Sequence, residues 1–173
     1  MLCRKHQVLF FSAANNTYWR THDRELQCNN LHCYCHNFHI IKNYINNTKY
    51  TLDLCMYLFT SEEIAQTVLD AHLRGIKIRI ITDFEMSHSS GSKMEVFQSH
   101  GIQVRFKKAT NCLMHHKFCL LDANTENGVL MTGSLNLTMQ AVAGNWDNAI
   151  FTTQTDLIQQ FQQEFNRIWS SFD

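Results

Sequence analysis

The fold and the chemistry of this sequence are decided by the stretch His115-His116-Lys117-Phe118-Cys119-Leu120-Leu121-Asp122. Its apolar run is bounded by polar residues, which predicts a buried β-strand over residues 115–121. Residues two apart on a strand point to the same face, so His115 and Lys117 should lie side by side while His116 faces the core or lies behind the site. A neutral imidazole is nucleophilic near pH 7. The stretch therefore predicts phosphodiester cleavage, with His115 as the nucleophile and Lys117 as the cation.

Polar residues further along the chain complete the predicted site. Ser134 and Asn136 carry hydrogen-bond donors for the oxygens of a phosphate. Gly133, directly before them, allows the backbone to approach a ligand closely. Asp147 begins the next expected strand, where a carboxylate can accept a hydrogen bond from the second imidazole nitrogen of the nucleophile and so fix its tautomer.

Short apolar strands alternate with amphipathic helices along the chain. Strands are expected over residues 8–11, 51–59, 76–82, 102–106, 115–121, 129–132 and 148–152, and helices over 38–45, 60–75, 92–100 and 157–172. This alternation predicts an α/β fold with a mixed, mostly parallel sheet flanked by helices on both faces. We see no low-complexity linker and no internal repeat, so residues 1–173 are expected to form a single domain.

The composition is that of an ordinary globular protein, with 45% hydrophobic and 17% charged residues. The 15 basic and 15 acidic side chains give zero formal net charge, so only local clusters of cations could attract a polyanion. No apolar run approaches the ~20 residues that cross a bilayer, and the chain as given is expected to be soluble. The 7 cysteines are an odd number and several lie in apolar runs, which argues for a reducing compartment and against a disulfide framework.

A cluster of cysteine and histidine residues precedes and enters the first expected helix. Its pattern is C-x4-C-x-C-x3-H, formed by Cys28, Cys33, Cys35 and His39, with His32 and His36 as possible substitutes. Thiolates and imidazoles at such short spacings suit a tetrahedral zinc ion with no open position, which is a structural site. The alternative is a loop that carries free thiols. We expect a small zinc-binding insertion over residues 28–39 within the α/β domain.

The order and spacing of these motifs resemble a known group of proteins. H-x-K-x4-D followed by G-S-x-N is the signature of the phospholipase D superfamily, and the chain is similar to its single-motif members, the Zucchini and mitochondrial phospholipase D group. The likeness extends from residues 8–11 through 114–118 to 165–169, which is nearly the whole chain. It implies a phospholipase D-like fold and a hydrolase that acts on phosphodiester bonds through a phosphohistidine, without a catalytic metal.

The resemblance also implies a role for each site residue. His115 would carry the phosphoryl group. Three side chains would hold the phosphate, namely Lys117, Ser134 and Asn136. Asp147 would orient the imidazole, at a position where the family more often has glutamate. Asp122 would make a structural hydrogen bond or ion pair rather than act in the chemistry.

The zinc cluster is covered by the same resemblance only in part. The segment Cys33-x-Cys35-x3-His39 looks like the zinc-binding segment of the Zucchini group. The remaining cysteine of the family does not fall at Cys28. Cys28 is therefore the nearest candidate for the fourth ligand, and Cys3 is the alternative.

The chain contains one copy of H-x-K-x4-D, whereas ordinary superfamily members carry two in one chain. A two-step mechanism needs a second imidazole to protonate the leaving oxygen and then to activate water. An isologous interface places identical residues face to face. We therefore expect a homodimer whose two-fold axis brings two His115 side chains into one shared site.

The substrate is open between two classes. Basic residues gather in the middle of the sequence, at Lys77, Arg79, Lys93, Arg105, Lys107 and Lys108. They could line a groove for a single-stranded nucleic acid, or half of them could be solvated strand edges and helix ends. A lipid would instead require an apolar entrance for acyl chains beside the phosphate site.

The resemblance bears on this choice. Zucchini-like proteins are implicated in endonuclease cleavage of single-stranded piRNA precursors at the mitochondrial outer membrane, which leaves 5′-phosphate ends. The mitochondrial phospholipase D name reflects cardiolipin hydrolysis to phosphatidate. We favour the endoribonuclease, held at the cytosolic side of the outer membrane through an anchor absent from this chain. Cardiolipin hydrolysis is the alternative, and a non-catalytic RNA-binding scaffold is the third interpretation, which the intact His115, Lys117 and Asn136 set disfavours.

Overall fold

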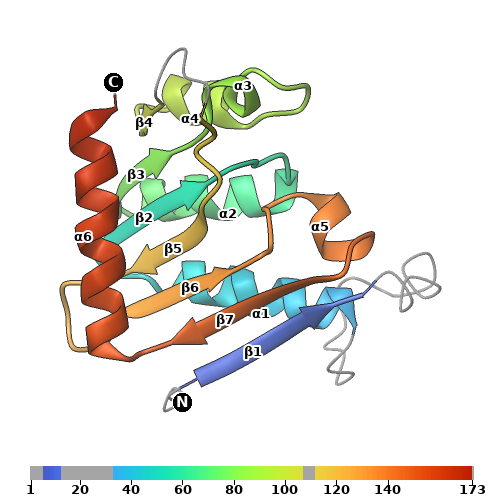
Figure 1. The fold of residues 1–173 in the computed structure, drawn as a ribbon, viewed down its shortest axis with the longest axis horizontal. Coiled ribbons are helices and arrows are strands. Elements are labelled where there is room, and N and C mark those ends of the chain that lie inside the picture. The colour runs from blue at the N-terminus through green and yellow to red at the C-terminus, as the bar shows by residue number, and fades with distance from the viewer. Residues whose placement is uncertain (1–5, 13–32, 107–111, 173) are drawn as a thin grey trace.

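The computed structural model describes residues 6–12, 33–106 and 112–172 (Figure 1). Within them, strands form one seven-stranded sheet in the order β1-β7-β6-β5-β2-β3-β4. The strands are β1 (His6–Phe11), β2 (Thr51–Met56), β3 (Lys77–Ile81), β4 (Gln103–Arg105), β5 (Lys117–Leu121), β6 (Val129–Gly133) and β7 (Asp147–Thr152). The helices are α1 (Tyr34–Asn47), α2 (Glu62–Leu73), α3 (Phe84–Ser87), α4 (Met94–Ser99), α5 (Met139–Ala143) and α6 (Thr155–Ser171).

The prediction of a mixed α/β fold is confirmed, but the prediction of a mostly parallel sheet is wrong. Only β2, β3 and β4 pair in parallel, while the pairs from β1 through β7, β6 and β5 to β2 are antiparallel. Parallel neighbours need a crossover of a dozen or more residues, which α2 and α4 supply. A short turn joins β5 to β6, and a segment with the one-turn helix α5 joins β6 to β7. The chain reverses direction at each of these connections, so neighbouring strands run in opposite directions.

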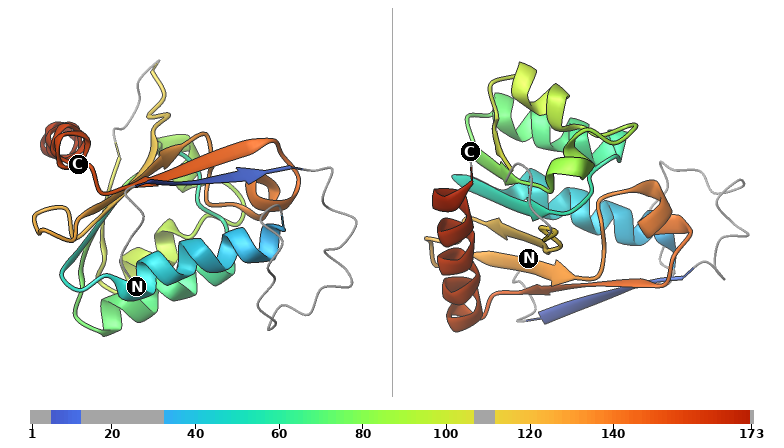
Figure 2. Two further views of the ribbon diagram at one scale, coloured as in Figure 1. Left: turned by 90° about the horizontal axis from the view of Figure 1, so that it is seen from below. Right: turned by 45° about the horizontal axis from the view of Figure 1, so that its top comes forward.

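Helices cover both faces of the sheet, as the sequence predicted. Figure 2 shows α1 and α2 on one side and α6 on the other. The strand β5 illustrates the consequence, because its side chains alternate between two apolar clusters. Cys119 and Leu121 pack toward α1 and α2, whereas Phe118 and Leu120 pack with Phe165 of α6. Burial on both faces explains why this strand is a continuous apolar run rather than an alternating one.

The helix α6 is fastened to the sheet by an arginine and a buried carboxylate. Arg79 lies opposite Asp53 in the β2–β3 register and donates to its carboxylate through Nε at 2.8 Å. The same guanidinium stacks over the rings of Phe165 and Trp169 of α6, at 4.8 Å and 5.3 Å from their centroids. In the part of the chain that the structure describes, no helix is long and apolar enough to cross a bilayer.

Candidate active site

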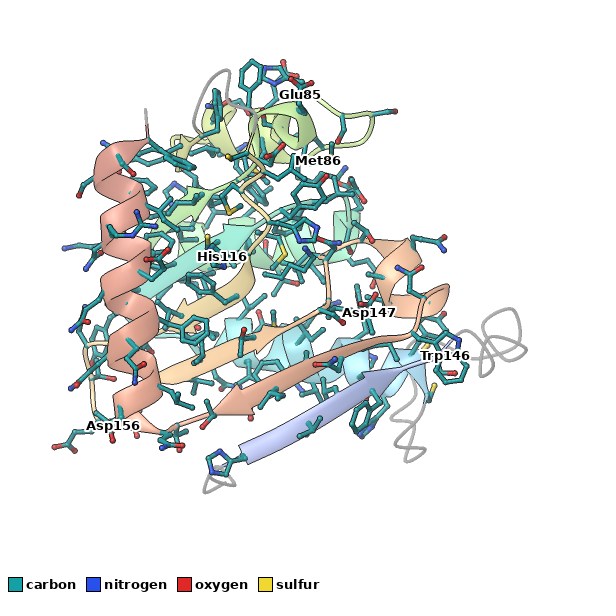
Figure 3. All side chains as sticks on the ribbon, in the orientation of Figure 1. Glu85, Met86, His116, Trp146, Asp147 and Asp156 are labelled. Atoms are coloured by element: carbon teal, nitrogen blue, oxygen red, sulfur yellow. The ribbon has the colours of Figure 1, made fainter. Side chains whose placement is uncertain are left out.

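The antiparallel strands bring the predicted site residues to one end of the sheet. Because neighbouring strands run in opposite directions, β5 starts where β2 and β6 end, and β7 starts beside the end of β6. His115 lies two residues before the start of β5, Ser134 directly follows β6, and Asp147 is the first residue of β7. Figure 3 labels Asp147 at this end of the sheet and His116 in the segment that leads into β5. Residues far apart in the sequence therefore meet around the H-x-K motif.

His115 and Lys117 lie in contact. The Nζ atom of Lys117 is 3.3 Å from Nε2 of His115 and donates a hydrogen bond to its backbone oxygen at 3.0 Å. β5 begins only at Lys117, so strand alternation alone does not bring the two side chains together. The hydrogen bond from Nζ of Lys117 to the backbone oxygen of His115 helps to hold them in contact. Burial lowers the pKa of Lys117, and the negative charge of Asp147 opposes that shift. The site thus holds an imidazole beside a partly desolvated ammonium group.

The ring of Tyr57 joins this pair, which sequence reasoning missed. It follows β2, and its centroid lies 4.5 Å from that of His115 and 4.9 Å from Nζ of Lys117. Such a ring restricts the imidazole and attracts the ammonium group through its electron-rich face. Its backbone N–H donates to the oxygen of His116 at 2.9 Å. Nothing in the sequence marks Tyr57, because an aromatic residue at the end of a strand is ordinary.

Asp147 is held by residues in the segment between β6 and β7. Its Oδ1 accepts from the hydroxyl of Ser134 at 2.6 Å, and its Oδ2 accepts from the amide of Asn145 at 3.2 Å. The Ser134 hydroxyl also accepts from the backbone N–H of Asn148 at 3.1 Å. Among the described residues, no hydrogen bond joins Asp147 to His115. Its predicted role in orienting the imidazole therefore stays a prediction.

Asn136 presents a buried amide oxygen that has no hydrogen-bond partner within the described residues. A buried polar atom without a partner costs free energy, which is typical of a side chain kept for a ligand. Glycine is required at position 133 for a different reason from the one that the sequence suggested. A Cβ atom there would collide with the backbone oxygen of Asn148, so the close approach of β7, rather than a ligand, requires glycine.

Asp122 lies at the far end of β5 from the nucleophile and is buried. Its carboxylate accepts from the backbone N–H groups of Lys49, Tyr50 and Thr51 at 2.8, 2.7 and 2.9 Å. Three charge-assisted hydrogen bonds to one carboxylate bind the end of β5 to the start of β2. These contacts are structural, and they leave Asp122 remote from the H-x-K pair.

A second buried aspartate holds the segment that carries the nucleophile. Oδ2 of Asp83 accepts from the backbone N–H of Met114 at 3.0 Å, and its Oδ1 accepts from the N–H groups of Glu85 and Met86 at the start of α3. The residue before His115 is thereby tied to the loop after β3. Sequence reasoning missed Asp83 because this contact joins residues about thirty positions apart.

His116 precedes β5, which begins at Lys117, so strand alternation does not place it, and of its two predicted positions the one in the core is wrong. Its side chain is half exposed beside α6, where Nε2 lies 3.6 Å from Oε1 of Glu164. A pocket of about 490 Å³ opens between this surface and the nucleophile. It is lined by Thr82, Asp83, Phe84, Cys112, Leu113, Met114, His115, His116, Arg167, Ile168, Ser171 and Phe172.

The predicted zinc ligands are only partly within the described residues, because Cys28 and Cys3 lie outside them. Cys33 precedes α1, and Cys35 and His39 lie one turn apart on that helix, a spacing that places two side chains on one face. Across residues 6–12, 33–106 and 112–172, no three potential metal ligands come together. The thiolate and imidazole donors have the chemistry for zinc, and the full set remains a prediction.

Comparisons with known proteins identify the family. Residues 41–169 match the family described as "Cardiolipin synthase, PLD-like domain". The chain is 36% identical to a mitochondrial cardiolipin hydrolase of Chlamydomonas reinhardtii, over 88% of this chain and 68% of that protein. It is 33% identical to that of Drosophila melanogaster, over 98% and 77%, and 37% identical to that of Homo sapiens, over 71% and 47%. The chain thus spans about half of the length of the human relative.

Solved structures show the same fold at lower identity. The structure of NucT from Helicobacter pylori has a TM-score of 0.76 and 19% identity over 97% of each chain. Nuc from Salmonella typhimurium, a phospholipase D family member, has a TM-score of 0.70 and 19% identity over 97% of this chain and 95% of its own. The family match and the curated relatives support a hydrolase that acts on phosphodiester bonds, and the solved structures show its fold. The chain belongs to the phospholipase D superfamily, and the curated relatives that it resembles are mitochondrial cardiolipin hydrolases.

Proposed function

We propose that the chain cleaves its substrate through a covalent phosphohistidine at His115. The observation that carries this proposal is the contact between the exposed His115 imidazole and the Lys117 ammonium group at 3.3 Å. An imidazole nitrogen forms a bond to phosphorus while the bond from phosphorus to the leaving oxygen breaks, and that oxygen takes up a proton. Water then attacks phosphorus and releases the imidazole. Lys117 and Asn136 stabilise the charge on the non-bridging oxygens.

The proton for the leaving oxygen requires a second acid. We propose that the His115 of a second copy supplies it and later activates the water, in a homodimer with one site on its two-fold axis. The His115 imidazole suits this arrangement because it is exposed at the surface. Within the described residues, Tyr57 and Lys117 contact one side of the imidazole and leave it accessible to a partner.

We propose cardiolipin as the first candidate substrate, which reverses the ranking that the sequence suggested. Of the six basic residues expected to line a nucleic-acid groove, the structure describes four, and three of these are engaged within the chain. Arg79 binds Asp53, Arg105 donates to the last carbonyls of α6, and Lys93 pairs with Glu62. Lys107 and Lys108 lie outside the described residues, and Lys77 remains exposed.

Apolar side chains near the site support a lipid. Leu113, two residues before the nucleophile, is 63% exposed, and Trp146, next to Asp147, is 76% exposed. An amphipathic tryptophan and an aliphatic side chain suit the interface between lipid headgroups and acyl chains. The names of the curated relatives point the same way. From the resemblance to the Zucchini group, we propose that the chain acts at the mitochondrial outer membrane on its cytosolic side.

Single-stranded RNA is the second candidate, with cleavage that leaves 5′-phosphate ends in piRNA biogenesis. The observation in its favour is the pair of aromatic rings, Phe84 and Phe172, that line the pocket beside His115. Bases of single strands commonly stack on such rings without sequence preference. The chemistry at the nucleophile is the same for both substrates.

One assay separates these functions. Purified protein is incubated with cardiolipin vesicles, single-stranded RNA, single-stranded DNA and duplex, with a chelator present and the folded state monitored by circular dichroism. We expect phosphatidate release from cardiolipin that is lost in the His115→Ala variant. Cutting of RNA without phosphatidate release would select the second candidate, and RNA binding without turnover would select a non-catalytic scaffold.

We also propose one structural zinc ion held by Cys33, Cys35 and His39 with Cys28 or Cys3. We expect about one zinc per chain after purification without chelator, because a tetrahedral site with thiolate ligands binds zinc tightly. The Cys35→Ser variant should lose zinc and melt at a lower temperature. The control is Cys112→Ser, which changes an exposed cysteine outside this set. Elemental analysis that finds no zinc in the intact protein would favour free thiols.

A further inference from the structure

The pocket beside the nucleophile contains a cation that the proposed reaction does not use. Arg167 on α6 and His115 line the same space, which at about 490 Å³ falls within the ~300–1,000 Å³ typical of sites for small molecules. The Arg167 side chain is 69% exposed, so a ligand in the pocket can reach its guanidinium group. The described residues of this pocket thus offer a second anion-binding group beyond the reacting one.

The present partner of Arg167 can be displaced. Its Nε and Nη2 donate to the two carboxylate oxygens of Glu164 at 2.7 Å each, three residues earlier on the same helix. These contacts raise the pKa of Arg167 and lower that of Glu164. Exposed pairs of this kind contribute little to stability because water screens them. Glu164 also lies 3.6 Å from the imidazole of His116, so it keeps a partner if the guanidinium turns toward a ligand.

The other walls of the pocket suit the remainder of a phospholipid. Apolar side chains line it, namely Phe84, Leu113, Met114, Ile168 and Phe172. The one carboxylate among its lining residues, that of Asp83, is buried, and both of its oxygens already accept hydrogen bonds from backbone N–H groups. A ligand that combines an anionic group with an acylated glycerol would match this surface.

We infer that the pocket binds the second phosphodiester of a lipid that carries two phosphates on one glycerol, with Arg167 as its main donor. This inference rests on the proposed function, because it assumes that the first phosphate is at His115. The planar fork of arginine matches a phosphate with two parallel hydrogen bonds. Arg167 would then determine specificity, because it distinguishes cardiolipin from phospholipids with a single phosphate.

Substitutions on either side of the Arg167–Glu164 pair have opposite expected effects. Arg167→Gln should raise KM for cardiolipin vesicles by about tenfold, since a hydrogen bond to a charged group is lost. Glu164→Gln removes the competing carboxylate and should lower KM. Neither variant should change hydrolysis of bis(p-nitrophenyl) phosphate, a soluble substrate with one phosphate. The control Lys77→Gln removes an exposed cation at the opposite end of β3 and should change nothing.

A binding measurement separates failure of this inference from failure of the proposed function. In the His115→Ala background, cosedimentation compares vesicles that contain cardiolipin with vesicles in which two phosphatidylglycerols replace each cardiolipin. The chain that keeps Arg167 should bind the cardiolipin vesicles more tightly than the phosphatidylglycerol vesicles, even though it turns over no substrate. Equal binding to both vesicles, or equal loss of activity on cardiolipin and on the soluble substrate, would overturn the inference. An effect of Arg167→Gln confined to a trinucleotide relative to a dinucleotide would also overturn it and assign the pocket to RNA.

Discussion

Replacing His115 with alanine is expected to abolish turnover while leaving the folded structure intact. The imidazole is the proposed nucleophile, and removal of a nucleophile commonly lowers kcat by about a thousandfold or more. The side chain is exposed and lies outside both apolar clusters, so the free energy of unfolding should change by less than about 0.5 kcal/mol. Hydrolysis of bis(p-nitrophenyl) phosphate and thermal melting measure the two effects on the same sample.

The matched control is His100→Ala, which removes another exposed imidazole, at the end of α4, and should leave activity unchanged. Rapid quenching should trap a phosphorylated chain from the intact protein and none from the His115→Ala variant. More than traces of activity in that variant, or a phosphoryl group on a different residue, would contradict the assignment of the nucleophile.

The sequence could predict those strands and helices that a local pattern of apolar and polar residues determines. The apolar run of β5 could be recognised because both of its faces are buried, and its end at Leu121 was predicted correctly, whereas the strand starts at Lys117, two residues later than expected. Strand direction could not be recognised, since an apolar run looks the same whichever way its neighbours run. The helices α3 and α5 were missed because a helix of one turn is too short to show a period of 3.6 residues.

The candidate site divides in the same way. The contact between His115 and Lys117 could be predicted from the sequence because residues two positions apart always lie close in space. Tyr57 and Asp83 could not be predicted, because they reach the site only when β2 and the loop after β3 lie beside the segment before β5. Arg79 shows the opposite error. As an isolated cation it suggested a nucleic-acid groove, but its register opposite Asp53 places it in a structural ion pair under α6.

Activity is expected to require two intact copies of the chain in one dimer. Mixing intact chains with His115→Ala chains and allowing exchange should give three kinds of dimer, of which only the fully intact kind has both imidazoles. With equal amounts of the two chains, the intact dimers are one half times one half, so about a quarter of the sites should remain active. Independent sites would leave half. The fraction of variant chain is varied at a constant total protein concentration. Activity should then fall with the square of the fraction of intact chain for a shared site, and linearly for independent sites.

The exchange itself needs a control, because separate dimers that never mix would also give a linear loss. Labelling the two chains with different fluorophores shows whether mixed dimers form, and mixing with Lys77→Gln chains should leave activity unchanged. The proposal of a shared site rests on the motif count of the chain. One H-x-K motif provides one imidazole, and the described histidine beside it, His116, faces α6 and Glu164 rather than Lys117. Its contact with Glu164 engages His116, so we expect the second acid to be the His115 of the other copy. Full activity in a monodisperse monomer, or a linear loss with mixing demonstrated, would show that one copy of the chain completes the reaction alone.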